Sequence, residues 1–457
     1  MISKLSDLEI PQNDPFANCQ LGRKKYAEIL TQIVSMYNNG CVLAINGEWG
    51  TGKTTFVKMW QQYLINKGVT TLYFNVWEND FISDPLVGLI GEFRELSSKY
   101  NIEDKFAKVT TTAGKIVLSM LPALVEAIAK QYLGKEAVNA IKDGTKGTVD
   151  ILEKEFQNYE EQKTSIAGFR KALTDFVSSC NSDKPLIFIV DELDRCNPTF
   201  AVKVLERIKH LFSIPNIVFV LSIDKKQLCN SIKGYYGSES LDAVNYLKRF
   251  IDIEYNLPEP DYEKFCNYLY WAFDIKVKLS RFFKDTDYFN EYASALFKQN
   301  NLSLRQMEKV YSLAGLALCC NKQIDSGAEL FLILTLLKVC YNDIYVLLEH
   351  GAYKTPQEFV NVIEHLLPYA NVSYQQRMSC YSFSYMLRAY FSKFGYADIN
   401  KLIKKDEKGA DTLIFDVTKL NVETVIAAVK YYSQREYYIE YVFDSITNLI
   451  DLLNSFE

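Results

Sequence analysis

The residues best suited to chemistry form the run GEWGTGKT, from Gly47 to Thr54. It fits the pattern G-x-x-x-x-G-K-[ST], in which glycines let the backbone turn tightly and bring its N–H groups against phosphate oxygens. Lys53 can reach the β- and γ-phosphates, and the Thr54 hydroxyl can bind Mg²⁺. An apolar run precedes the motif and a helical pattern follows it, as a phosphate-binding loop between a strand and a helix requires. The predicted nucleotide-binding residues are Gly47, Glu48, Trp49, Gly50, Thr51, Gly52, Lys53, Thr54 and Thr55.

A pair of acids follows the apolar run PLIFIV, at Asp191 and Glu192. A buried strand that ends in two acids is the form of a Walker B motif, in which the aspartate holds the Mg²⁺ shell and the glutamate polarises the attacking water. An exposed acidic turn after a strand is an equally common alternative, but the phosphate loop upstream favours the catalytic interpretation. We therefore expect Thr54 and Asp191 as metal ligands, and Glu192 and Lys53 as catalytic residues.

Further candidates lie downstream of these acids. Ser222 and Asp224 end the next apolar run and are candidate γ-phosphate sensors, with an ordinary turn after a strand as the alternative. Arg195, Arg249 and Arg305 could stabilise the charge of the transition state, although for each arginine taken alone a surface or salt-bridge role is the favoured interpretation. Because phosphoryl transfer relies on positioned positive charge, we expect at least one arginine to be catalytic, with Arg249 and Arg305 as the assigned candidates.

The elements that must position these residues alternate between strand and helix. Apolar runs predict five strands, at 41–46, 71–76, 185–190, 216–223 and 251–257. Strands separated by helices indicate an α/β fold with a parallel sheet, and continuous apolar runs suit strands covered on both faces. We expect a lead-in at 1–20, a P-loop domain at 21–260 with a helical insertion at about 90–180, a helical lid-like domain at 261–350 and a C-terminal helical domain at 351–457, with no strand after 260.

The composition limits the classes of function. A net charge of -5 gives no overall attraction to nucleic acid or anionic lipid. Ten cysteines without a C-x-x-C pair, and only three histidines, disfavour a zinc site and indicate a reducing, cytoplasmic location. No run reaches the roughly 20 apolar residues that span a bilayer, since the nearest candidate, 116–129, contains Pro122 and Glu126.

Several motifs together resemble those of the KAP family of P-loop NTPases. They are Leu21-Gly22-Arg23 before the first strand, Trp49 within G-x-W-G-x-G-K, FNVWE at 74–78, DELDRC at 191–196 and YLKRF at 246–250. A generic phosphate loop does not demand the tryptophan. The resemblance covers about residues 14–260, and extends more loosely to about 350.

The resemblance implies a five-stranded sheet in the order 5-1-4-3-2, with a helical insertion between the Walker motifs. It also implies ATP rather than GTP, a choice that the lack of an N-K-x-D motif supports, and a sensor-type role for Arg305. Many family members carry transmembrane helices in the insertion, whereas residues 115–133 are too polar and short, so we expect a soluble member. Prokaryotic relatives often act in defence against phages or plasmids, which extends to this chain as an expectation only.

These features leave three hypotheses. The first is a switch driven by ATP hydrolysis, with protein partners and a homo-oligomer as further expectations. The second is an assembly scaffold that binds nucleotide with little hydrolysis, which the same motifs allow. The third is a nucleic-acid motor, which the acidic balance and the lack of a basic-aromatic cluster disfavour.

Overall fold

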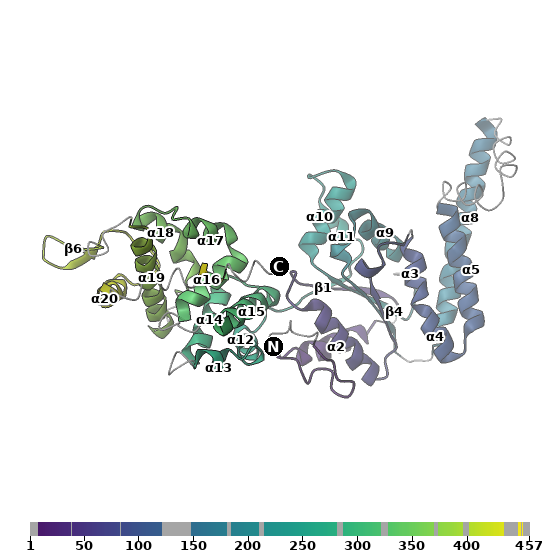
Figure 1. Cartoon of the computed structure of the whole chain (residues 1–457). Helices are drawn as coiled ribbons and strands as arrows, with labels where there is room; N and C mark the ends of the chain where they lie inside the picture. Colours follow the sequence, from purple (N-terminus) through teal and green to yellow (C-terminus); the bar gives the residue numbers. More distant parts are fainter. Residues whose placement is uncertain are drawn as a thin grey trace. The chain divides into compact units, whose positions relative to one another are not determined.

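The computed structural model describes residues 8–37, 39–82, 84–120, 148–180, 184–209, 214–280, 287–320, 328–369, 373–395, 402–433, 447–448 and 450. Two compact units divide the chain, one from Leu8 to Pro258 and one that includes Glu259–Glu457 (Figure 1). The first contains residues 47–54 and the acids Asp191 and Glu192, and the second is mainly helical. The predicted further division near residue 350 stays a prediction.

A five-stranded parallel sheet forms the centre of the first unit. Its strands are β1 (Cys41–Asn46), β2 (Thr71–Asn75), β3 (Leu186–Asp191), β4 (Ile217–Ile223) and β5 (Ile253–Asn256). Their order across the sheet is β2-β3-β4-β1-β5, which is the predicted order 5-1-4-3-2 read from the other edge. The register pairs Asn75 with Asp191 and Asp191 with Ser222, so the polar residues at the strand ends lie side by side.

Both faces of this sheet are covered, as the continuous apolar strands predict. Alternate strand residues enter two separate cores, with Phe188 and Phe219 in one and Ile189 and Val220 in the other. Helices α1 (Lys24–Val34) and α2 (Lys53–Asn66) belong to the second core. The first core includes residues of α3 (Pro85–Gly91), α9 (Pro198–Lys209) and α10 (Lys225–Tyr236), and Figure 1 shows these helices across the sheet from α2.

Between β2 and β3 the described chain is mostly helical. Helices α4 (Phe93–Tyr100), α5 (Glu103–Met120) and α8 (Thr148–Val177) follow α3, and α5 runs beside α8 (Figure 1). The middle of the predicted insertion, including Pro122 and Glu126, lies outside the described residues. Within the described part of the chain, no helix combines the length and apolar character needed to cross a membrane.

The second unit corrects one prediction, because it is not entirely helical. Its longer helices are α12 (Tyr262–Ala272), α14 (Asp287–Gln299), α15 (Leu304–Cys320), α16 (Ala328–Cys340), α19 (Ser373–Phe394) and α20 (Val422–Ser433), and shorter ones are α13 (Ile275–Leu279), α17 (Asn342–Glu349) and α18 (Pro356–Ile363). Strands β6 (Ile403–Lys405) and β7 (Asp411–Leu413) form an antiparallel hairpin. Its turn has Gly409 at a φ of +80°, and Asp406 accepts hydrogen bonds from Lys408 and Ala410. Strands of three residues are too short for an alternating pattern to reveal them.

Candidate nucleotide site

The P-loop, residues 47–54, has the backbone shape that its glycines allow. Gly50 and Gly52 have φ values of +80° and +79°, in the left-handed region that glycine adopts readily. The Gly47 amide donates to the Ile223 carbonyl at 3.1 Å, which joins the loop to the end of β4. Helix α2 then begins at Lys53, and its N-cap Gly52 offers no side chain to its first amides. Those N–H groups are therefore available to an anion.

Lys53 lies within the loop and is buried. Its Nζ donates to the carbonyl oxygens of Gly47 at 2.6 Å and Glu48 at 3.0 Å. Burial lowers the pKa of this ammonium, and the nearby carboxylates of Asp194, Asp224 and Asp191 oppose that shift. The positive charge is thus held inside the loop, where a polyphosphate would meet it.

Arg23 braces the loop from outside, although the sequence marked it only as part of a family motif. Its Nη2 donates to the Thr51 carbonyl at 2.7 Å and its Nη1 to the Gly52 carbonyl at 3.1 Å. The side chain is buried, and this burial lowers its pKa to about 10. The arginine precedes α1, so the first helix of the unit positions the phosphate loop.

Trp49 connects the loop to two buried acids. Its backbone N–H donates to Asp224 Oδ2 at 3.2 Å, and its indole N–H donates to Asp194 Oδ2. Asp224 also caps α10 by accepting from the amides of Lys226 and Gln227 at 3.1 and 3.2 Å. Burial raises the pKa of Asp194, and the Trp49 hydrogen bond and Lys53 oppose that shift. The sensor candidate Asp224 therefore has structural contacts of its own, and its predicted role stays a prediction.

Asp191 lies at the end of β3 and is buried. Its Oδ2 accepts from the Tyr73 hydroxyl at 2.9 Å, and its Oδ1 accepts from the Glu192 amide at 3.0 Å. Burial, and to a smaller extent the charge of Asp191, raises the pKa of the Tyr73 hydroxyl. This hydroxyl therefore stays protonated and can donate its hydrogen bond. The carboxylate is thus oriented at the edge of the sheet on which the P-loop lies.

The side chain of Glu192 contacts Arg195, Thr54 and Asn75. Its φ is +62°, an uncommon conformation for a residue with a side chain, and it precedes the turn η2 (Leu193–Arg195). Oε1 accepts from Arg195 Nη1 at 2.6 Å and lies 3.4 Å from Thr54 Oγ1, and Oε2 accepts from Asn75 Nδ2 at 3.4 Å. The carboxylate thereby connects the P-loop helix, β2 and the turn after β3.

Oxygen donors at this edge of the sheet suit magnesium. Thr54 offers a hydroxyl and Asp191 a carboxylate, which are ligands of the kind that Mg²⁺ prefers. Beside them Ser222 is fully buried and pairs in register with Asp191, and its hydroxyl has no partner among the described residues. The described residues contain no cluster of three His, Cys, Asp or Glu that could hold a metal. Magnesium generally relies on few protein ligands together with phosphate oxygens and water.

The three candidate arginines fall in different places. Arg195 contacts Glu192, whereas Arg249 is exposed in the turn after α11 (Ala243–Leu247). Arg305 is exposed on α15, which belongs to the helical unit. The structure therefore brings Lys53, Thr54, Asp191, Glu192 and Ser222 together with Arg195, and the roles of Arg249 and Arg305 stay predictions.

A comparison with known protein families matches the part of the chain that contains these residues. Residues 23–313 match the family model described as the KAP family P-loop domain. This chain belongs to the KAP family. Residues 47–54, the acids Asp191 and Glu192 and the five-stranded sheet all lie within the matched range.

Among relatives, the KAP chain is 23% identical over 281 residues to the phage T7 exclusion protein of Escherichia coli K12. The match spans 57% of this chain and 33% of that protein. Among solved structures, the ORC2 protein of Aeropyrum pernix has a TM-score of 0.34 and 13% identity, with 91% of this chain and 94% of that one covered. AMPPCP-bound DnaA from Aquifex aeolicus has a TM-score of 0.31 and 12% identity, with coverages of 95% and 93%.

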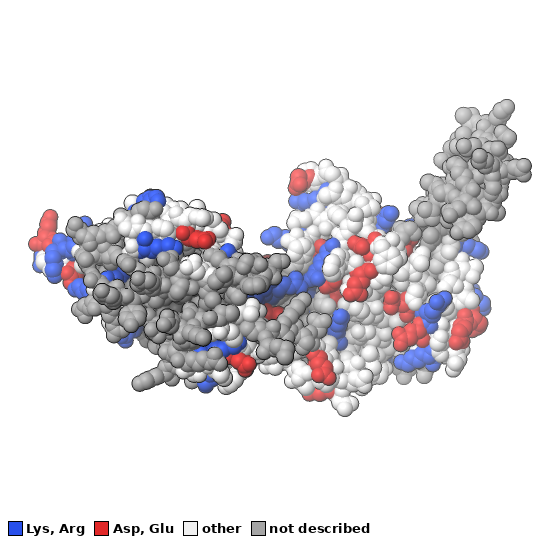
Figure 2. Space-filling view, in the orientation of Figure 1, with Lys and Arg blue, Asp and Glu red and all other residues white. Residues whose placement is uncertain are grey.

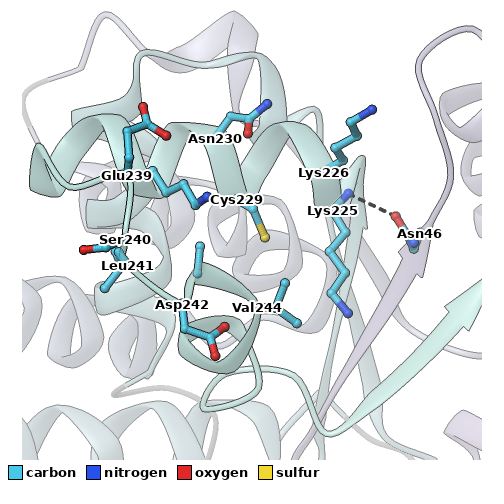
Figure 3. Close-up of a pocket in the computed structure, with 12 residues that line it drawn as sticks. Asn46, Lys225, Lys226, Cys229, Asn230, Glu239, Ser240, Leu241, Asp242 and Val244 are labelled. Atoms are coloured by element: carbon cyan, nitrogen blue, oxygen red, sulfur yellow. Dashed lines mark hydrogen bonds between the residues drawn. The ribbon is translucent and has the colours of Figure 1, made fainter.

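The KAP domain also contains a hollow of about 630 Å³ (Figure 3). Lys226, Cys229 and Asn230 of α10 line it, together with the segment 239–244. Asn46, the residue before the P-loop, reaches its edge and accepts a hydrogen bond from the Lys225 amide at 3.0 Å (Figure 3). Because the P-loop residues 47–54 do not line this hollow, it is separate from the phosphate site.

Proposed function

We propose that this KAP protein binds ATP with Mg²⁺ at the P-loop, hydrolyses it and acts as a nucleotide-driven switch. One observation carries the proposal: Thr54, at the start of the P-loop helix, lies 3.4 Å from the carboxylate of Glu192. This distance brings the phosphate-binding and water-activating sides to a single place. Family membership supports the nucleotide-binding part.

Each residue has a role that its position supports. Lys53 leaves the carbonyls of Gly47 and Glu48 to bind the β- and γ-phosphate oxygens. Thr54 and Asp191 would hold Mg²⁺, which when bound would supply positive charge to the phosphates. Glu192 then accepts a proton from the attacking water.

Two further groups would stabilise the γ-phosphate. The buried Ser222 hydroxyl lies beside Asp191 and can donate a hydrogen bond, whereas Asp224 would act indirectly through Trp49. Arg249 and Arg305 remain candidates for supplying positive charge to the transition state. The switch itself would pass the nucleotide state to the helical unit through the chain that follows β5.

The purified protein tests the hydrolysis claim. We expect phosphate release from ATP that needs magnesium and that falls by about 10²- to 10⁴-fold in Glu192→Gln, the contribution typical of a general base. Binding of a fluorescent ATP analogue should persist in that variant. Equal release by wild type and Glu192→Gln, or release that chelation of magnesium leaves unchanged, would contradict the proposal.

A binding module that holds nucleotide structurally and acts as an assembly scaffold, with little hydrolysis, is the second candidate. The ion pair between Arg195 and Glu192 favours it, since a carboxylate bound to a guanidinium is not free to accept a proton from water. In that case Lys53→Ala would abolish nucleotide binding but leave partner assembly unchanged. If nucleotide binding and assembly are lost together, the switch is favoured.

The face of α4 and α5 shown in Figure 2 gives no support to nucleic acid as a substrate. Acidic and basic side chains are mixed over α4 and α5 on the face shown in Figure 2, instead of forming one basic patch. A rise in phosphate release on adding DNA or RNA would revive the motor hypothesis.

A role in defence against phage follows from the name of the relative alone. We propose that the chain contributes to phage exclusion through protein partners. Plaque formation on bacteria that express the wild type or Lys53→Ala tests this, because protection should need nucleotide binding. Partners can be captured on Glu192→Gln with ATP, and equal protection by Lys53→Ala would remove the link between the site and defence.

A further inference from the structure

The carboxylate of Glu192 already accepts hydrogen bonds from the protein on both oxygens. Arg195 Nη1 lies 2.6 Å from Oε1, and Asn75 Nδ2 lies 3.4 Å from Oε2. The shorter contact is a charge-assisted hydrogen bond, the stronger kind, and the longer one is weak. The side chain of Glu192 is 10% exposed, so few other directions remain from which water can approach it.

The turn after β3 is built to bring these two residues together. Glu192 adopts a φ of +62°, and the Arg195 amide donates back to the Glu192 carbonyl at 3.2 Å. This closes a tight turn, so the guanidinium three residues ahead folds over the carboxylate. The Cys196 thiol donates to the same carbonyl at 3.4 Å and is buried, which fixes the far end of the turn.

We propose that Arg195 is a positioning residue that restrains Glu192 and thereby limits the basal rate of hydrolysis. A general base needs a carboxylate oxygen within hydrogen-bond reach of the water it deprotonates. While Arg195 occupies Oε1, that oxygen serves the ion pair instead. This inference rests on the proposed function, since it concerns the rate of the same reaction.

The exposure of Arg195 makes release physically reasonable. Its side chain is 25% exposed, whereas that of its partner is 10% exposed, so the guanidinium can leave the carboxylate without crossing the core. Asn75 is fixed differently, because its Oδ1 accepts from the amides of Trp77 and Glu78 at 3.1 and 3.3 Å. Arg195 is therefore the movable restraint and Asn75 the fixed one.

Single-turnover and steady-state phosphate release by Arg195→Ala tests the proposal. We expect the basal rate at saturating ATP to rise about tenfold, the change that corresponds to losing one charge-assisted hydrogen bond, with nucleotide affinity unchanged within about twofold. Arg195→Lys should give an intermediate rate, because an ammonium keeps the charge without the planar fork. Adding Glu192→Gln to Arg195→Ala should abolish the gain.

Controls separate this effect from damage to the fold. Arg94→Ala removes an exposed arginine on α4 and should leave the rate and melting temperature unchanged. Arg195→Gln keeps most of the side-chain length if the alanine variant folds poorly. If Arg195 served only to hold the fold together, Arg195→Ala would lower the rate of phosphate release. A higher rate in this variant is therefore the result that indicates a restraint on Glu192.

The outcomes are distinguishable from failure of the proposed function. If the wild type hydrolyses ATP and Arg195→Ala is equal or slower, this inference is overturned and the proposed function stands. If the wild type is inactive but Arg195→Ala gains activity that depends on Glu192, the restraint is confirmed, and Arg195 blocks basal hydrolysis entirely. If both bind ATP and neither hydrolyses it, the restraint and the hydrolysis claim are both overturned.

Discussion

The P-loop and the turn after β3, residues 191–196, differ in how the protein supports them. The loop is braced from outside, by Arg23 on two of its carbonyls and by Asp224 on the Trp49 amide. The turn is instead closed on itself, with Glu192 in a left-handed conformation and bound to Arg195 three residues later. The backbone of the loop is thus held in place for a ligand, whereas the carboxylate of Glu192 is engaged with protein side chains.

This difference predicts that different residues determine the affinity for ATP and the rate of hydrolysis. Backbone groups held by distant residues give a phosphate site that needs little rearrangement, and such preorganisation favours binding. A carboxylate engaged by a neighbouring guanidinium has to exchange partners before it can act on water. Changes to the loop and its braces should therefore alter affinity, and changes to the turn should alter the rate of hydrolysis.

The largest expected effect compares Lys53→Ala with Glu192→Gln. Removing the ammonium that lies inside the loop should weaken ATP binding about 100-fold or more, which corresponds to the loss of charge-assisted bonds to phosphate. Glu192→Gln should bind within about threefold of the wild type, because an amide of the same size replaces the acid. Titration calorimetry measures both, and similar losses in the two variants would break the distinction between loop and turn.

Arg23→Ala should give the next largest effect on binding. The carbonyls of Thr51 and Gly52 would lose a buried guanidinium, and the loop would no longer be fixed in its binding conformation. We expect ATP affinity to fall about tenfold, the equivalent of one net hydrogen bond. Lys24→Ala is the matched control, since this neighbouring side chain is 51% exposed and pairs with Asp14 at the surface. A loss of rate in Arg23→Ala without a loss of affinity would contradict the assignment of Arg23 as a brace.

The same contrast explains what the sequence could predict. The P-loop and the acids at 191 and 192 are local patterns beside strong apolar runs, so their placement at the carboxyl edge of the sheet followed directly. The strand order came from the family resemblance, and the observed order agrees with it.

The braces could not be found in this way. Arg23 acts on a loop 29 residues away, and Trp49 meets Asp194 across 145 residues, so only the folded chain brings these groups together. Asn75 reaches Glu192 because β2 and β3 pair in register, which no local pattern specifies. The hairpin β6–β7 was missed for the opposite reason, since each strand contributes only three residues of signal.

The remaining prediction concerns the stability that Trp49 provides. Trp49→Phe removes the indole N–H that donates to the buried Asp194, and we expect a loss of about 1 to 3 kcal/mol in the free energy of unfolding near neutral pH. Chemical unfolding followed by circular dichroism measures it. Trp271→Phe is the control, because that side chain is 63% exposed and lies in the helical unit.

The pH dependence of this loss sharpens the prediction. Burial raises the pKa of Asp194 in the folded state, so the folded protein binds its proton more tightly than the unfolded chain, and stability falls as the pH rises through that raised pKa. The Trp49 hydrogen bond opposes the shift, so its removal raises the pKa further and penalises the ionised acid more than the protonated one. The stability difference between Trp49→Phe and the wild type should therefore widen as the pH rises through the raised pKa of Asp194. A difference that stays constant through that pH rise would show that the indole stabilises the loop by packing alone, and not by its bond to the carboxylate.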